Sequence, residues 1–102
     1  MDCQKTDTIK TLLRQSAKWT MASNQDKNPI IALLHANYGA GYLSALRDIA
    51  TDQEIETATG TDILKFRGEI IREQGAITEH VMKLCPKYSP KKVQLSKVEG
   101  EF

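Results

Sequence analysis

The sequence predicts an all-α fold, a small bundle of three long helices and one short helix, followed by an irregular basic C-terminal tail. Apolar residues recur at helical spacing over long stretches, without the alternation typical of strands. The three prolines, at 29, 86 and 90, fall outside the interiors of those stretches. The 102 residues are enough for one domain. We expect a single helical domain over residues 1–86, and a tail over 87–102 that is flexible or ordered by a partner.

The first helix is expected from Thr6 to about Ala22, with Thr6 or Asp7 as its N-cap. Its stripe at helical spacing consists of Ile9, Leu12, Leu13, Ser16 and Trp19. The wholly polar segment 23–28 is interpreted as a connector to the second helix.

The second helix is expected from Pro29 to about Ala50, because Asn28 is a favourable cap and proline is tolerated at the first helical position. Large apolar residues occupy well over half of its circumference: Ile30, Ile31, Leu33, Leu34, Leu43, Leu46 and Ile49. A helix that is apolar on most sides is usually buried on most sides. In so short a chain we expect part of that burial to come from a second subunit, which predicts a homodimer or higher oligomer.

Two further helices follow. Thr51 and Glu54 match a capping box that begins a helix of about two turns, and Gly60 is suited to end it. The last helix is expected over about 62–84, capped by Thr61 or Asp62 and stopped by Pro86. Ile63, Ile70, Ile77 and Leu84 recur in it every seven residues, as in a coiled-coil seam.

Small residues mark one part of the second helix. Ala32, Ala36 and Ala40 recur at a spacing of four, beside Gly39 and Gly41. Glycine in a helix interior costs ~1 kcal/mol relative to alanine, so this pair needs an explanation. We interpret Ala32, Ala36, Gly39 and Ala40 as a surface that lets another helix approach closely. The alternative is a kink or a glycine-opened pocket beside a ligand.

His35, Tyr38 and Tyr42 share one side of the second helix at offsets of three and four. Together with Arg67 of the last helix they are the candidate ligand-binding residues. The alternative is an amphipathic interface patch, which is common for tyrosine. No partnered carboxylate is identified for this histidine, so evidence for a catalytic site is weak.

A second polar set is expected between the second and last helices. Arg67 falls in the apolar stripe of the last helix and could contact Asp48, assisted by Asn37 or Gln74. This contact would fix the packing of the two helices, or form the polar end of a binding site. The Arg67 side chain could instead extend to water.

No cofactor and no metal are predicted. Glu69, Glu73 and His80 are interpreted as a solvated edge of the last helix, because they lack the Glu-x-x-His pattern of bundle metal sites. Cys3 and Cys85 fall at opposite ends of the expected bundle, too far apart for a disulfide.

Composition limits the classes of partner. The net charge of +1 argues against nucleic-acid binding, and the longest apolar run, Ile30 to Leu34, is too short for a membrane span of about 20 residues. Two cysteines and an N-terminus without an apolar stretch predict a cytoplasmic protein. Residues 52–62 contain acids but no bases, and residues 83–97 contain lysines but no acids. One interpretation is that acids stabilise helix N-termini and bases stabilise helix C-termini through the helix dipole. The alternative is that the basic tail docks on another protein.

The sequence therefore predicts a non-enzymatic helical interaction or assembly protein that acts as a homo-oligomer. The alternative is a small-molecule-binding protein or an enzyme that uses the His/Tyr/Arg pocket. The chain shows no nucleophile–base pair, no metal quartet and no phosphate loop, so the enzyme is the second choice. The biological process is not predicted.

Overall fold

The computed structural model describes residues 1–88, and all regular structure in that range is helical, as predicted. Three long helices, α1 (Cys3–Gln25), α2 (Pro29–Ile49) and α4 (Ile63–Leu84), accompany the short helix α3 (Asp52–Thr59). A 3₁₀ turn, η1 (Pro86–Tyr88), follows α4. The remainder of the expected tail, residues 89–102, lies outside the described residues.

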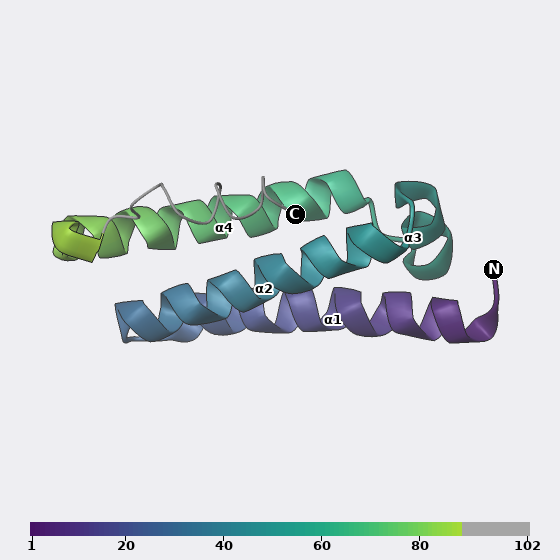
Figure 1. The fold of residues 1–102 in the computed structure, drawn as a ribbon, viewed down its shortest axis with the longest axis horizontal. Coiled ribbons are helices and arrows are strands. Elements are labelled where there is room, and N and C mark those ends of the chain that lie inside the picture. Colours follow the sequence, from purple (N-terminus) through teal and green to yellow (C-terminus); the bar gives the residue numbers. More distant parts are fainter. Residues whose placement is uncertain (89–102) are drawn as a thin grey trace, which may run out of the picture.

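Successive long helices run in opposite directions, and α2 lies between α1 and α4 (Figure 1). The short helix α3 turns the chain at the end of the bundle where the N-terminus lies, and α4 ends at the opposite end (Figure 1). Helix α2 packs against both other long helices, whereas α1 and α4 contact each other sparingly. Among residues 1–88, one side of α2 is therefore left without a neighbouring helix. No helix within residues 1–88 is both long and apolar enough to cross a bilayer.

The helix starts predicted after residue 26 are confirmed. The Asn28 side chain accepts from the backbone N–H groups of Ile30 (2.9 Å) and Ile31 (3.3 Å), directly before Pro29. Asp62 caps α4 in the same way. Gly60 ends α3 at φ +68°, in the left-handed region that glycine enters without strain.

The capping box of α3 is formed as predicted. Thr51 Oγ1 accepts from the Glu54 N–H at 3.1 Å, and the Glu54 carboxylate accepts from the Thr51 N–H at 3.0 Å. Lys5 of α1 adds an ion pair to Glu54 at 2.9 Å. The backbone hydrogen bond from Thr51, followed by the Lys5 contact, lowers the pKa of Glu54 from its ordinary value.

The predicted bounds of α1 are wrong at both ends. The helix begins at Cys3 because Asp2, rather than Thr6 or Asp7, is the N-cap and accepts from the Lys5 N–H at 2.7 Å. It continues to Gln25 through residues that the polar composition assigned to a connector. Ser23 is buried, and its hydroxyl donates to the Thr20 carbonyl at 2.6 Å, so its polarity is satisfied inside the helix.

The apolar core lies at the α3 end of the bundle, where all four helices meet. Its buried members are Ile9, Leu43, Leu46, Ala50, Ile55, Ile63 and Ile70. The predicted heptad seam of α4 is thus used inside the chain at Ile63 and Ile70, while Leu84 at its far end is exposed. Away from α3, Val81 of α4 is also buried, and a polar contact joins α4 to α2: Gln74 Nε2 donates to Asn37 Oδ1 at 2.9 Å.

Glu73 departs from the predicted solvated edge of α4. It is half-buried and faces the C-terminal part of α1. The side-chain amide nitrogen of Asn24 faces α4 and donates to Glu73 Oε2 at 2.8 Å. Glu69 and His80, by contrast, are exposed.

Candidate functional site

The buried side of α2 consists largely of small residues. Ala32, Ala36 and Gly39 are buried, and Ala40 is half-buried against the core. The Ser16 hydroxyl of α1 donates to the Gly39 carbonyl at 2.7 Å. A Cβ added at Gly39 would overlap the Thr20 hydroxyl and lie 3.0 Å from the Ser16 carbonyl oxygen. Helix α1 therefore approaches α2 at a place where only glycine fits.

The opposite side of α2 carries large apolar residues. Exposed members are Ile30, Ile31, Leu34, Tyr38, Tyr42 and Ile49. Leu34 is 42% exposed and Tyr38 44% exposed. The sequence places no Asp, Glu, Lys or Arg between Lys27 and Arg47, so nearly the whole helix lacks formal charge apart from any on His35. Such a continuous apolar face is typical of a contact surface.

Five residues of this face follow a heptad pattern. Ile31, Leu34, Tyr38, Gly41 and Ala45 are spaced three, four, three and four residues apart, and we name them the α2 seam. This spacing is that of the a and d positions along which two helices pair. All but Gly41 carry apolar or aromatic side chains, and their size falls from the N-terminal to the C-terminal half. The seam thus has a bulky half and a small half.

An aromatic cluster borders the α2 seam. The Trp19 ring of α1 lies 4.9 Å from the His35 ring and 5.3 Å from the Tyr38 ring, the latter edge-on. The centres of the His35 and Tyr38 rings are 6.1 Å apart, and the Lys18 ammonium lies 5.0 Å from the centre of the Trp19 ring. These contacts fix the orientation of Tyr38 beside the exposed face.

His35 has a carboxylate partner that the sequence reasoning missed. Its Nδ1 lies 2.6 Å from Asp26 Oδ2, and both side chains are about one-fifth exposed (21% and 22%). Asp26 also ends α1, since its N–H donates to the Ala22 carbonyl. The missed signal was an acid in the α1–α2 turn, nine residues before the histidine. A carboxylate acceptor favours the Nδ1–H tautomer, which leaves the Nε2 lone pair available.

Tyr38 and Tyr42 also line a shallow groove at the α1–α2 junction. The groove measures about 450 Å³ and is lined by Trp19, Asn37, Tyr38, Gly41, Tyr42 and Ala45. His35 is held by Asp26 instead of lining this groove. An open apolar surface with tyrosine hydroxyls at its edge suits a partner side chain or an aromatic ring.

Arg67 does not join the other three candidate residues. It lines a separate cleft of about 400 Å³ between α2 and α4, with Asp48, Ser44 and Gln74 among the neighbours. Within residues 1–88, no ion pair joins Arg67 to Asp48. Asn37 and Gln74, which were expected to assist that contact, form a hydrogen bond with each other instead. The four-residue pocket proposed from sequence is therefore divided between two sides of α2.

Residues suited to other chemistry are scattered. Cys3 and Cys85 are unpaired and lie at the start of α1 and the end of α4. Within the described part of the chain, no three His, Cys, Asp or Glu side chains are grouped as metal ligands. Comparison with known protein families, curated proteins and solved structures finds no match to this chain.

Proposed function

We propose that this protein is a non-enzymatic assembly protein that acts as a homo-oligomer, with the α2 seam as its contact between copies. The observation that carries the proposal is the exposed, uncharged heptad of Ile31, Leu34, Tyr38, Gly41 and Ala45. Burying this seam removes apolar surface from water without desolvating a formal charge on the seam itself.

A second copy fits the seam because its two halves are complementary in size. Two α2 helices paired antiparallel about a two-fold axis place a d position of one opposite an a position of the other. In the register centred between Gly39 and Ala40, Tyr38 lies over Gly41 of the second copy, and Leu34 lies over Ala45. These layers each combine one large and one small side chain, while at each end Ile31 lies over the exposed Asp48 of the second copy.

The flanks of the seam also match in this register. Asn37 lies near Ser44 of the second copy, and both are polar and exposed. On the other flank His35 lies near Tyr42 of the second copy. Because Asp26 contacts His35 Nδ1, the Nε2 atom of this ring can accept a hydrogen bond from the Tyr42 hydroxyl of the second copy. Within residues 1–88, neither His35 Nε2 nor the Tyr42 hydroxyl has another hydrogen-bond partner.

The test is the mass of the protein in solution. Ala45→Glu adds a charge at an exposed seam position, so it should reduce the mass measured by sedimentation equilibrium while leaving helical content unchanged. Ala76→Glu is the matched control, an exposed alanine of α4 away from the α2 seam, and should keep the parent mass. An Ala45→Glu variant that sediments like the parent contradicts the proposal.

A charge exchange tests the register. Leu34→Glu alone and Ala45→Lys alone should each weaken association. In the double variant the introduced glutamate faces the introduced lysine of the second copy, so association should be regained in part. A double variant that is weaker than both single variants rejects the antiparallel pairing.

The groove beside Trp19 favours a second candidate function, the binding of a small aromatic ligand between Tyr38 and Tyr42. This candidate predicts a chain that does not pair through α2 and whose Trp19 fluorescence changes when aromatic fragments are added. A Tyr42→Ala variant would lose that response. A parent chain that self-associates through α2 covers the same groove, so the sedimentation experiment separates the two functions.

A further inference from the structure

Helix α4 carries a second heptad, distinct from its buried one, whose members are exposed (Leu64, Ile71, Gly75) or half-buried (Gly68, Thr78, Met82). Its members are Leu64, Gly68, Ile71, Gly75, Thr78 and Met82, spaced four, three, four, three and four residues apart, and we name them the α4 seam. Leu64 is 62% exposed and Ile71 43% exposed. The packing of the chain uses the neighbouring row of Ile63 and Ile70, so the α4 seam is left over.

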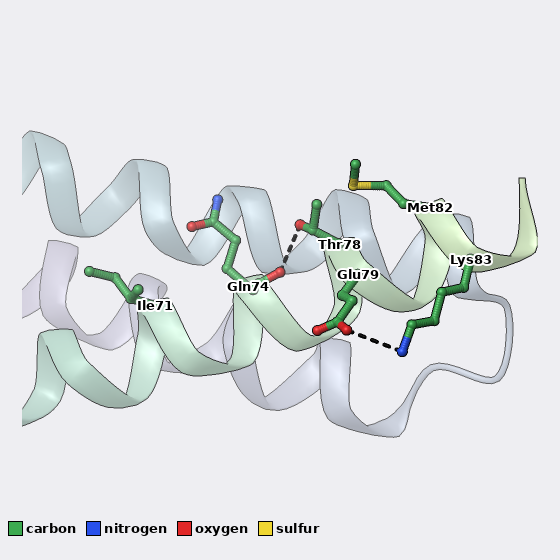
Figure 2. A pocket seen from close by; sticks show the side chains of 7 residues that line it. Ile71, Gln74, Thr78, Glu79, Met82 and Lys83 are labelled. Atoms are coloured by element: carbon green, nitrogen blue, oxygen red, sulfur yellow. Dashed lines mark hydrogen bonds and ion pairs between the residues drawn. The ribbon is translucent and has the colours of Figure 1, made fainter. Parts of the chain in front are cut away.

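The α4 seam is hollowed over its C-terminal half. A groove of about 490 Å³ runs along Ile71, Gly75, Thr78 and Met82, with the Glu79–Lys83 ion pair (3.1 Å) along one edge (Figure 2). A Cβ built at Gly68 or at Gly75 would have no atom of the described part of the chain within 4 Å. The Thr78 hydroxyl donates to the Gln74 carbonyl at 2.7 Å (Figure 2), so its hydrogen-bonding need is met within the helix. The groove is open and lacks only an apolar occupant.

We propose that the α4 seam is a second self-association surface, occupied by the α4 helix of another copy running antiparallel. A two-fold axis beside Glu73 pairs every member of the seam with another member. Ile71 enters the hollow over Gly75 of the second copy, Gly68 lies opposite Thr78, and Leu64 lies opposite Met82. The exposed isoleucine and the glycine hollow are four residues apart, which is the offset that this pairing requires.

The charged flank of the seam supports a second copy as the occupant. Lys65, Arg72 and Glu79 follow one another along this flank at intervals of seven residues. Antiparallel pairing brings Lys65 of one copy near Glu79 of the other, at both ends of the contact. Arg72 lies beside the two-fold axis and faces its own counterpart. The pairing thus contains two attractive pairs and one repulsive pair, and each can be altered separately.

This contact does not require the α2 seam, and together the two produce an assembly larger than a dimer. Each seam forms a self-complementary contact, and a chain with two such contacts joins more than two copies. The two contacts can therefore be removed one at a time.

Sedimentation equilibrium of the parent, three seam variants and one control variant tests the inference. Gly75→Glu fills the hollow and adds a charge at an exposed position with open space, so the fold should persist, as checked by circular dichroism. We expect the parent to exceed a dimer, Gly75→Glu and Ala45→Glu each to be dimers, and the double variant to be a monomer. Ala76→Glu, one residue away and off the seam, should keep the parent mass.

The outcomes separate the two proposals. A Gly75→Glu variant with the parent mass overturns the α4 contact, whether or not α2 pairs. A reduced mass for Gly75→Glu with an unchanged mass for Ala45→Glu overturns the α2 contact alone.

Exchanging the flank charges tests the antiparallel register of α4. In the Ala45→Glu background, Lys65→Glu and Glu79→Lys should each weaken the remaining dimer at least several-fold, and the combined exchange should restore it to within a few-fold. Arg72→Gln removes the repulsive pair and should tighten the dimer. Failure of the combined exchange to restore association, or weaker association of Arg72→Gln, overturns the register proposed here.

Discussion

The hydroxyl of Ser16 donates to the carbonyl oxygen of Gly39 over 2.7 Å, so a short side chain of α1 bonds directly to the backbone of α2. It requires small residues on the inner side of α2. In this part of the helix the bulky residues Leu34 and Tyr38 are on the outer side, whereas Leu43 and Leu46 enter the core nearer to α3. The packing between α1 and α2 therefore determines which face of α2 is left for another molecule.

Gly39→Ala should destabilise the fold by about 1–2 kcal/mol, the range of mild overpacking. The added methyl overlaps the Thr20 hydroxyl and crowds the Ser16 carbonyl, which outweighs the gain of up to ~1 kcal/mol in helix propensity. Urea denaturation in the Ala45→Glu/Gly75→Glu background measures this effect without association.

Gly41→Ala is the matched control, because a Cβ at Gly41 has no atom within 4 Å. It should be neutral or stabilising by up to ~1 kcal/mol. Equal effects of the two substitutions would show that α1 does not approach Gly39 closely.

The Asp26–His35 contact predicts the tautomer of the histidine. With Asp26 Oδ2 2.6 Å from Nδ1, the neutral ring should carry its proton on Nδ1. Nitrogen-15 NMR of the ring distinguishes the two tautomers directly. A neutral ring protonated mainly on Nε2 would contradict the contact.

Removing the carboxylate should loosen the α1–α2 turn. Asp26→Ala should lower the free energy of unfolding by about 0.5–1.5 kcal/mol, the usual net value of one hydrogen bond. Asp26→Asn retains an acceptor oxygen and should lose less. Urea denaturation at pH 7 compares them; similar stability of Asp26→Ala and the parent would argue against this role.

Glu54 should contribute to acid sensitivity. Its pKa is lowered from 4.5 in the folded protein by the Thr51 hydrogen bond and then by Lys5. A carboxyl with a lowered folded pKa stabilises the fold above its unfolded pKa, and this contribution is lost as the pH falls through the folded value. Glu54→Gln should therefore be less stable than the parent at pH 7, with the difference shrinking at acidic pH.

The control for the pH dependence is Glu56→Gln in the same helix. Glu56 is exposed and makes no hydrogen bond or ion pair through its side chain within residues 1–88. The urea midpoint of the Glu56→Gln variant should equal that of the parent across the same pH range. A Glu54→Gln variant that also follows the parent would show that the capping box does not depend on charge.

Local signals in the sequence predicted most of the fold. Asn28 with Pro29, Thr51 with Glu54, and Asp62 each act within one helical turn, so their positions alone indicate where α2, α3 and α4 begin. The end of α1 was missed because a polar run resembles a loop. Ser23 lies in this run but is part of the helix, because its hydroxyl donates to a backbone carbonyl of the preceding turn.

The candidate site was less predictable because it depends on which helix faces meet. Helical spacing placed His35, Tyr38 and Tyr42 on one side of α2 but did not indicate which neighbour would cover that side. Arg67 was assigned to the same site, although α4 packs on the other flank of α2. The α1–α2 turn brings Asp26 to His35, and the residue spacing within either helix does not reveal this contact.

The most direct test of the central claim is isotope-filtered NMR on a mixture of labelled and unlabelled chains. Leu34 and Ala45 are eleven residues apart, about 16 Å along one α-helix, so their methyl groups cannot touch within a single chain. Antiparallel pairing of the α2 seam predicts an intermolecular contact between the Leu34 and Ala45 methyl groups. A self-associated sample in which these methyl groups show only intramolecular contacts would contradict the account.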